Sequence, residues 1–531
     1  MPQGSRPCPD LQRATSKPPP RLTTSIPQWP LHASTPCTLM MPLFFRASLS
    51  QLLCSNAPML QQQSNNAPIL QCSSAPCSSI PRFLLLLLLF QGSLSAQKNP
   101  RADSTIHPAL DPSEIRIYQV YLRNFSNEGS IKGLYSGLDH IQSLGFNTLW
   151  LMPIHPVGQV NRKGTFGSPY SVQDYRKINP EFGNEQDFRV LVRECHRRGL
   201  RVILDWVANH TAFDHPWTQS HPEWYTRDAS GKILPPNDDW TDVADLNFDH
   251  PELREAMIAE MEYWVQEFHV DGFRCDVAMM VPGDWWSTCI QRLRRHRPLF
   301  MLAEANGPEF YRYGFNSTYG WDFYHRLKGV FQGASLRGLD SAWTAENSQA
   351  TQATGGFGRV MRFVTNHDET SWDQVPAKVF GSDQAAMAAY VISQQPVSIP
   401  LVYNGQEVGH PLKQNIFERS PIRYQQNPEI LRFYQDYGAI FRLEKAYQSG
   451  DFVRLRPEDK DCWWSLRGQG DEAVLCVVNT RNKTLVTKVP TAFRLKSFEN
   501  IRDGSTAYLK EDLELEPYGI RLFKPYGLSK R

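Results

Sequence analysis

Short apolar runs alternate with amphipathic stretches over the central part of the chain. The apolar runs read IRIYQVYL, NTLWLMP, RVILDWV, GFRCDVA and LFMLAEA, and the stretches with helical spacing lie between them at 131–144, 184–199, 251–268 and 283–297. Apolar runs of this length are typical of strands that are buried on both faces. The alternation predicts parallel strands covered by helices.

The same alternation continues toward residue 407. RVMRFVTNH (359–367), a helical stretch at 382–394 and SIPLVYNGQE (398–407) bring the number of probable strands to seven, and we expect an eighth between residues 312 and 325. Eight such units predict a (β/α)₈ TIM barrel over residues 97–440. A doubly wound sheet is the alternative, but GGFGRVM lacks the third glycine of a dinucleotide fingerprint and precedes a strand instead of a helix.

Two segments depart from the alternation. The connection after the third predicted strand, residues 211–249, is long and rich in Trp, Asp and Pro, and long loops of this kind are usually functional, so we expect a short inserted domain there. Beyond residue 440 the pattern changes to short β-like runs without helices between them, DFVRLRP, EAVLCVVN, LVTKVP and IRLFKP. This predicts a C-terminal antiparallel β-sandwich over 441–531.

Residues 1–96 differ from the rest of the chain in composition. They hold 14 of the 39 prolines and six basic residues against one acid, which predicts a disordered leader. The leader ends with Arg82, eight apolar residues at 83–90 and the small residues Ser93, Ser95 and Ala96. This arrangement is typical of a secretory signal peptide, and the apolar run is too short to span a membrane. We therefore expect a secreted or periplasmic protein.

Charge and cysteine content exclude several classes of function. Residues 97–531 carry 50 Lys and Arg against 53 Asp and Glu, a formal charge of 50 − 53 = −3, which gives no electrostatic footprint for nucleic acid. Their five cysteines contain no CxxC pair, so neither a zinc site nor a disulfide framework is indicated. The candidate chemistry must come from other residues.

Ionisable side chains stand at the ends of four predicted strands. They are Asp205, Asn209 and His210 after the third strand, Arg274 and Asp276 at the fourth, Glu304 at the fifth, and His367 and Asp368 at the seventh. In a parallel barrel the carboxyl ends of the strands meet at one face, where the active site lies. One buried carboxylate is as readily explained by a structural ion pair, but four strand ends in order predict one shared cavity.

Glycosidic cleavage is the chemistry that needs two carboxyl groups in opposite protonation states. Arg274 stands two residues before Asp276, and we expect its charge to lower the pKa of Asp276 and keep that group ionised. Glu304, among apolar neighbours, should keep its proton to a higher pH. Asp276 is then the candidate nucleophile and Glu304 the candidate acid and base. Asp368 could stabilise the positive transition state, with His210 and His367 binding sugar hydroxyls.

DWVANH, GFRCDVAMM, LAEA and FVTNHD resemble the four ordered signature segments of the α-amylase family, glycoside hydrolase family 13. The resemblance extends to GFNTLWLMPIHP, GSPYSVQDYRKINPEFG, VADLN and IPLVYNGQE, and covers about residues 113–525. It implies a retaining double displacement with Asp276, Glu304 and Asp368 as nucleophile, acid and base, and stabiliser. It also implies a substrate subsite, lined by Arg274, His210, His367, Asp205 and a stacking tyrosine, Tyr170.

The sequence departs from the family pattern three and four residues after Asp276. Many relatives have Lys and His there, which bind glucan and help to hold calcium, and this chain has Met279 and Met280. Asn209 and Asp245 stand where other calcium ligands are found in the family, but a Ca²⁺ site needs six to eight oxygens. We expect no required cofactor and no tightly held calcium ion.

The resemblance implies an α-glucan hydrolase that acts on starch or maltooligosaccharides, with no nucleic acid partner and no membrane span. A transglycosylase, or an enzyme like cyclomaltodextrinase or neopullulanase, would have the same site and is the alternative. A non-catalytic binding protein is a third reading, against which the retention of all three carboxylates argues. Trp217, Trp224 and Trp240 of the long loop are candidate glucan-stacking platforms.

Overall fold

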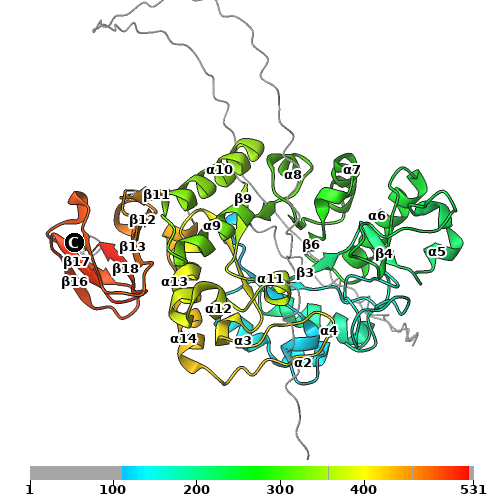
Figure 1. Ribbon diagram of the computed structural model, residues 1–531, viewed down its shortest axis with the longest axis horizontal. Coiled ribbons are helices and arrows are strands. Elements are labelled where there is room, and N and C mark those ends of the chain that lie inside the picture. Colours follow the sequence, from blue (N-terminus) through cyan, green and yellow to red (C-terminus); the bar gives the residue numbers. More distant parts are fainter. Residues whose placement is uncertain (1–110, 357, 449, 457, 526–531) are drawn as a thin grey trace, which may run out of the picture. The chain divides into compact units, whose positions relative to one another are not determined.

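The computed structural model describes residues 111–525 apart from residues 357, 449 and 457 (Figure 1). The proline-rich leader 1–96 and its apolar run at 83–90 lie outside the described residues. Within the described part of the chain, no helix is both long and apolar enough to cross a membrane. The five cysteines of this part are free and buried.

Eight parallel strands form a closed barrel. They are β1 (Ile117–Val120), β2 (Thr148–Leu151), β3 (Arg201–Trp206), β6 (Gly272–Cys275), β7 (Phe300–Ala303), β8 (Ser317–Tyr319), β9 (Arg359–Arg362) and β10 (Ser398–Tyr403). Their order around the barrel is β1-β10-β9-β8-β7-β6-β3-β2. Most strand residues are buried, because helices cover the outside and side chains fill the inside. The predicted barrel is confirmed, and β8 lies within the interval 312–325 where an eighth strand was expected.

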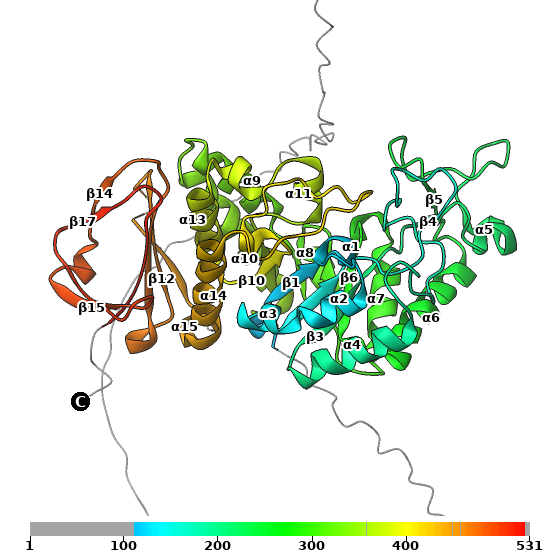
Figure 2. The ribbon, with the colours of Figure 1, turned by 90° about the horizontal axis from the view of Figure 1, so that it is seen from below.

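Helices surround the barrel strands in both ribbon views (Figures 1 and 2). The longer ones are α4 (Glu185–Arg197), α6 (Pro251–Glu267), α7 (Gly283–Leu293), α9 (Trp321–Phe331), α10 (Arg337–Thr354), α13 (Asp383–Ser393) and α14 (Pro428–Leu443). The start of α4 is fixed by a capping box, in which the Asn184 side chain accepts from the Asp187 amide and the Asp187 carboxylate accepts from the Asn184 amide. The predicted helix at 131–144 is divided at Gly137 into α2 (Ile131–Ser136) and α3 (Leu138–Ser143).

The connection from β3 to α6 contains a small antiparallel sheet. β4 (His210–Ala212) pairs with β5 (Val243–Asp245), so residues at the two ends of the expected insertion lie side by side. The short helix α5 (Trp217–Ser220) lies between them in the sequence, and Figure 2 shows the three elements together and apart from the barrel strands. His210 is thereby held next to Asp245, close to the carboxyl end of β3.

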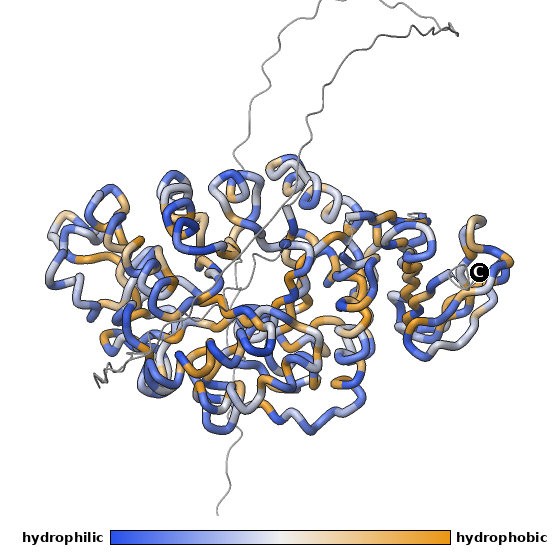
Figure 3. The backbone as a smooth tube through the Cα atoms, turned by 180° about the vertical axis from the view of Figure 1, so that it is seen from behind, coloured by the Kyte–Doolittle hydropathy of each residue, from blue (hydrophilic) through white to orange (hydrophobic). Residues whose placement is uncertain are grey.

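The C-terminal part is an antiparallel β structure. Its main sheet has the order β11-β12-β13-β18-β15-β16, and β14 (Leu485–Lys488) pairs with β17 (Asp512–Leu515) in a second sheet. The main-sheet strands are β11 (Phe452–Leu455), β12 (Cys462–Arg467), β13 (Val474–Asn479), β15 (Lys496–Asn500), β16 (Thr506–Leu509) and β18 (Ile520–Pro525). The four predicted β-like runs are all strands. Hydrophobic segments alternate with hydrophilic ones along the whole described chain (Figure 3).

Arg467 on β12 connects the C-terminal sheet to the barrel part and to α15 (Lys445–Gln448). The Arg467 guanidinium donates from Nη1 to the Gln395 carbonyl and from Nη2 to the Tyr447 carbonyl, at 3.1 and 3.0 Å. Burial lowers the pKa of Arg467 to about 10. These contacts belong to the end of the barrel away from the catalytic candidates, because Gln395 precedes β10.

Candidate active site

A cavity of about 590 Å³ opens at the carboxyl ends of the barrel strands. Its lining includes the three carboxylates that the sequence singled out, Asp276, Glu304 and Asp368. A volume between about 300 and 1,000 Å³ is usual for a small-molecule site. The carboxyl groups predicted to share one cavity are therefore found in one cavity.

Arg274 lies at the centre of the carboxylate cluster and has no exposed surface. Its Nη1 donates to Asp205 Oδ1 at 2.7 Å and to Asp276 Oδ1 at 2.9 Å. Its Nη2 forms an ion pair with Glu304 Oε2 at 2.8 Å, without the alignment of a hydrogen bond. Because one planar guanidinium contacts Asp276 and Glu304 together, these two carboxyl groups can be only a few ångströms apart.

Strand register explains why Arg274 contacts carboxylates from three strands. Arg274 on β6 is paired with Asp205 on β3 and with Leu302 on β7, and Glu304 follows Leu302 by two residues. Asp276 is two residues after Arg274 and therefore belongs to the same face. The aromatic rings of Trp150, Tyr170 and Tyr319 surround the guanidinium at 5.1 to 5.9 Å.

A second chain of hydrogen bonds connects Asp205 to His367. The Tyr170 hydroxyl lies 3.1 Å from Asp205 Oδ2 and 2.6 Å from His367 Nε2. The Gln119 amide nitrogen lies 2.7 Å from His367 Nδ1, so Nδ1 accepts and the proton of the neutral ring is on Nε2. Tyr170 can then accept from His367 and donate to Asp205. The ring of Tyr170 stacks on His367 at 5.4 Å.

Asp368 joins this network through His367, whose Nε2 lies 3.3 Å from Asp368 Oδ2. Both residues belong to α11 (His367–Trp372), which begins directly after the loop that follows β9. The helix start is held by Asn366, whose side chain accepts from the amides of Asp368 and Glu369. Contacts thus run without interruption from Asp368 through His367, Tyr170, Asp205 and Arg274 to Asp276 and Glu304.

Burial raises the pKa values of the three aspartates in this network. The pKa of Asp205 rises to about 6 and that of Asp368 to about 7. The pKa of Asp276 is also raised, because burial and the neighbouring carboxylates outweigh the attraction of Arg274. Arg274 does act to lower this pKa, but the expectation that its charge keeps the pKa of Asp276 below the ordinary value is wrong. One guanidinium shared among three carboxylates offsets only part of the cost of burying them.

The two histidines of the cavity are neutral at physiological pH. Burial lowers the pKa of His210 to about 3, and burial together with the charge of Arg274 brings the pKa of His367 well below its usual range. A neutral imidazole has one donor and one acceptor nitrogen. Both residues can bind sugar hydroxyls without adding charge to the cavity.

The inserted segment supplies one wall of the cavity. Trp240 lines it and packs at 5.5 Å from the ring of His210. Lys163 ties this wall to the loop after β2, because its Nζ donates to the Asp239 carbonyl at 2.6 Å and pairs with Asp242 Oδ1 at 3.0 Å. Trp217 and Trp224 pack against each other at 5.2 Å and are not among the residues of the cavity wall. Of the three tryptophans suggested as platforms, only Trp240 reaches the cavity.

The residues suggested as calcium ligands, Asn209 and Asp245, both contact protein groups. One carboxylate oxygen of Asp245 accepts from the Thr226 hydroxyl at 2.6 Å, and the Asn209 amide nitrogen lies 3.3 Å from His210 Nδ1. Across the described residues, no group of three or more His, Cys, Asp or Glu side chains is arranged to hold a metal ion. Met279 and Met280 are exposed by 54% and 43%.

Four residues of the site were not found from the sequence. Trp150 donates from Nε1 to Asp205 Oδ2 at 3.0 Å, and the Tyr319 hydroxyl accepts from Arg274 Nε at 3.1 Å. Gln119 orients His367, and a polar residue inside the apolar strand IYQV was the signal for it. Trp372 lines the cavity and is 64% exposed, and no pattern in the sequence distinguished it from other tryptophans.

Comparison with known proteins agrees with this geometry. The family model for the α-amylase catalytic domain matches residues 119–242 and 224–313. The crystal structure of an α-amylase from Lactobacillus plantarum has a TM-score of 0.69 and 30% identity, and the match covers 78% of this chain and 99% of that chain. Alpha-amylase 3 of Dictyoglomus thermophilum is 28% identical over 385 residues, which are 65% of this chain and 73% of the relative.

The closed barrel, the carboxylate cluster at its carboxyl end and these similarities define a glycoside hydrolase. More narrowly, the chain belongs to the α-amylase family.

Proposed function

We propose that this protein cleaves α-glucosidic bonds in starch or maltooligosaccharides by a retaining double displacement. The observation that carries the proposal is the contact of Arg274 with both Asp276 and Glu304, at 2.9 and 2.8 Å. Retaining glycosidases have carboxyl groups about 5 to 5.5 Å apart, whereas inverting enzymes need a wider gap for water. Two carboxyl groups on one guanidinium fit the shorter spacing.

In the first step, an ionised oxygen of Asp276 attacks the anomeric carbon. Oδ1 of Asp276 accepts from Arg274, while Oδ2 accepts no hydrogen bond from the described residues and is available for attack. The bond from the anomeric carbon to the leaving oxygen breaks, and Glu304 gives its proton to that oxygen. The product of this step is a glycosyl ester on Asp276 and a shortened glucan.

In the second step, water attacks the same carbon from the opposite direction. Glu304 takes a proton from the water, the ester bond breaks, and Asp276 leaves as a carboxylate. Two inversions give a product with the starting configuration. Asp368, His210 and His367 would hold the sugar hydroxyls, and the charge of Asp368 would stabilise the positive transition state.

The experiment compares full-length Asp276→Asn and Glu304→Gln variants on maltoheptaose and on α-maltosyl fluoride. Both variants should lose maltoheptaose hydrolysis by at least about 10³-fold, because each removes a group that acts only in the transition state. Fluoride departs without a proton, so Glu304→Gln should keep the first step on the fluoride and Asp276→Asn should not. Asp284→Asn is the matched control, because Asp284 is a 71% exposed carboxylate on the outer helix α7.

Two results would contradict the proposal. Hydrolysis by Asp276→Asn within tenfold of the parent would exclude it as the nucleophile, and a β-anomeric first product would exclude retention. The same digest tests the alternative of glycosyl transfer, because products longer than maltoheptaose show that a sugar replaces water in the second step. Amylose, pullulan and a cyclodextrin as substrates then separate an α-amylase from a cyclomaltodextrinase or neopullulanase activity.

We also propose that the protein is exported. The support is the sequence of Arg82, the apolar run at 83–90 and the small residues that end at Ala96. Expression of the full chain in a secreting host should give extracellular protein that begins close after Ala96, as determined by N-terminal sequencing. Uncleaved protein that stays inside the cell would contradict export.

A further inference from the structure

Trp372 is a large, exposed aromatic residue in the wall of the cavity that holds the carboxylates. It is 64% exposed, and among the large exposed hydrophobic residues of the described chain it alone lines the cavity that contains Asp276 and Glu304. An aromatic ring that stays in water leaves a large apolar area unburied, which is unfavourable unless a partner covers it. Because the ring borders the cavity, a bound substrate can cover it.

The helix that carries Trp372 also carries Asp368. Both residues belong to α11 and are four positions apart, so their side chains lie on one helix face with Cβ atoms about 5–6 Å from each other. Asp368 lines the cavity, 3.3 Å from His367 Nε2. Trp372 is consequently one helical turn away from Asp368, where its ring can lie beside a further sugar of a bound chain.

The tryptophan is supported by the loop that follows β10. Its ring packs against Phe417 at 5.9 Å with an interplanar angle of 68°, and Phe417 lines the same cavity. The hydroxyl of Ser371, the neighbouring residue, lies within hydrogen-bond distance of the Gln414 carbonyl, at 2.6 Å. The Phe417 carbonyl accepts from the Phe166 amide at 3.1 Å, which connects this loop to the loop that carries Tyr170.

Two aromatic walls therefore border the cavity, one with Trp372 and Phe417 and one with Trp240 of the inserted segment. The flat C–H face of a pyranose suits an aromatic ring, and its hydroxyls at the edge remain free for polar groups. The space of about 590 Å³ is more than one sugar ring requires. The occupant that fits these features is a chain of several α-linked glucose units.

We propose that Trp372 is a sugar-stacking residue outside the subsite of Tyr170, His210 and His367, and that it gives this enzyme its preference for longer glucans. The inference rests on the proposed function, because it concerns how the same site selects substrates by their length. Trp372 touches no reacting atom in this scheme. Its contribution is to binding, so its loss should raise KM or Kd and leave the chemistry of a short substrate unchanged.

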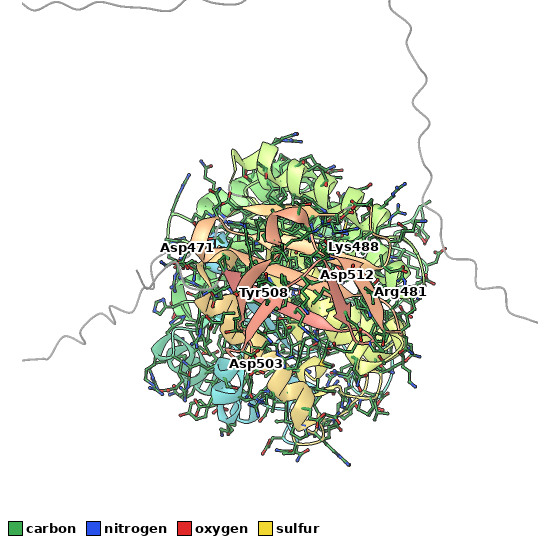
Figure 4. All side chains as sticks on the ribbon, turned by 90° about the vertical axis from the view of Figure 1, so that its left-hand side faces the viewer. Asp471, Arg481, Lys488, Asp503, Tyr508 and Asp512 are labelled. Carbon is green, nitrogen blue, oxygen red and sulfur yellow. The ribbon has the colours of Figure 1, made fainter. Side chains whose placement is uncertain are left out.

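The test compares Trp372→Ala with Trp372→Phe on maltoheptaose and on 4-nitrophenyl α-maltoside. Trp372→Ala should lower kcat/KM for maltoheptaose about tenfold, mainly through KM, and change kcat/KM for the short substrate less than twofold. Trp372→Phe keeps a flat ring and should stay within threefold of the parent on both substrates. Tyr508→Ala is the control, because Tyr508 is a 54% exposed aromatic residue on β16 of the C-terminal sheet (Figure 4).

A binding measurement separates this inference from the proposed chemistry. Calorimetric titration of maltoheptaose into Glu304→Gln and into the double variant Glu304→Gln/Trp372→Ala needs no turnover. A tenfold weaker Kd in the double variant supports the role of Trp372, whereas continuous heat of hydrolysis from Glu304→Gln would show that the assignment of Glu304 has failed and not the inference. An equal Kd in the two proteins, or equal losses of kcat/KM on the long and the short substrate, would overturn the inference.

Discussion

The backbone amide of Val277 donates to Glu304 Oε2 at 2.7 Å. Val277 directly follows Asp276 and has φ 35° and ψ 47°, the left-handed conformation that β-branched residues rarely adopt. The same carboxylate oxygen is paired with Arg274 at 2.8 Å. A strained backbone at this point therefore orients Glu304 relative to Asp276, and strain of this kind persists where the surrounding structure holds it for a function.

Replacement of Val277 by glycine should lower the activity without lowering the stability of the protein. Glycine adopts the left-handed conformation without steric cost, so we expect the free energy of unfolding to stay equal or rise by up to about 1 kcal/mol. The more mobile backbone should hold Glu304 less firmly and lower kcat about three- to tenfold. Urea unfolding and initial rates on maltoheptaose measure both. Val281→Gly is the control, because Val281 has φ −112° and glycine there should only lower the free energy of unfolding. If Val277→Gly loses as much stability as this control, the argument from backbone strain is contradicted.

Removal of the Arg274 charge should destabilise the protein in a pH-dependent way. Arg274→Met leaves three buried carboxyl groups without a countercharge, and the loss of one partner from a buried ion cluster costs about 3 to 5 kcal/mol. The effect should be smaller at pH 5 than at pH 8, because protonated carboxyl groups need no countercharge. Urea unfolding at both pH values checks this. Arg292→Met removes a partly exposed surface pair and should cost less than about 1 kcal/mol at either pH.

The barrel could be predicted from the sequence because its strands and several helices have strong patterns. Strands such as β2 and β3 are buried at every position, and α6 has buried residues at regular helical spacing. Helix α10 was not predicted, since only three of its 18 residues are buried and its periodicity is correspondingly weak. Strands β15 and β16 are short and mostly exposed, so they too lack a clear alternation.

The site could be predicted as a set of residues but not as a set of contacts. The strand ends identified Asp276, Glu304 and Asp368, because each of them follows a buried apolar run. That one guanidinium serves three carboxylates depends on the register of β3, β6 and β7, and the sequence does not give a register. The direction of the Asp276 pKa shift was wrong because a local pair of Arg274 and Asp276 was assumed, whereas burial and the neighbouring carboxylates raise this pKa more than Arg274 lowers it.

The Tyr170 hydroxyl should contribute to activity separately from its ring. Tyr170→Phe keeps the stacking surface and removes the contacts with His367 Nε2 at 2.6 Å and Asp205 Oδ2 at 3.1 Å. The loss of two hydrogen bonds should lower kcat/KM about tenfold, and Tyr170→Ala should lower it at least about 100-fold because the sugar platform is lost as well. Steady-state kinetics on maltoheptaose give both values. Equal activity of Tyr170→Phe and the parent would show that the hydroxyl does not orient the site.

Removal of divalent metal ions should leave the enzyme active. We expect no tightly held calcium ion, because Asp245 accepts from the Thr226 hydroxyl and Met279 and Met280 stand where many relatives have Lys and His. We expect EDTA to change kcat/KM less than twofold and the Tm by less than about 1 °C, because a ligand that does not bind the folded state cannot stabilise it. Kinetics and calorimetry on the dialysed full-length protein test this. A drop of the Tm that added Ca²⁺ reverses would contradict the prediction.

Ionisation of Asp368 should lower the stability of the folded protein as the pH rises. Its pKa is raised from 3.8 to about 7, so the folded state binds the proton more tightly than the unfolded state does. The stabilising contribution of this proton is full at low pH and is lost as the pH rises through about 7. Asp368→Asn has no charge to lose, and it should therefore gain stability relative to the parent between pH 5 and pH 8. We expect a gain of about 1 kcal/mol, well below the full value of the shift, because 31% of the Asp368 side chain is exposed and solvent screens its charge. Thermal unfolding of both proteins across this pH range measures the difference. A difference that stays constant, or that falls as the pH rises, would show that Asp368 is already ionised without cost in the folded cluster.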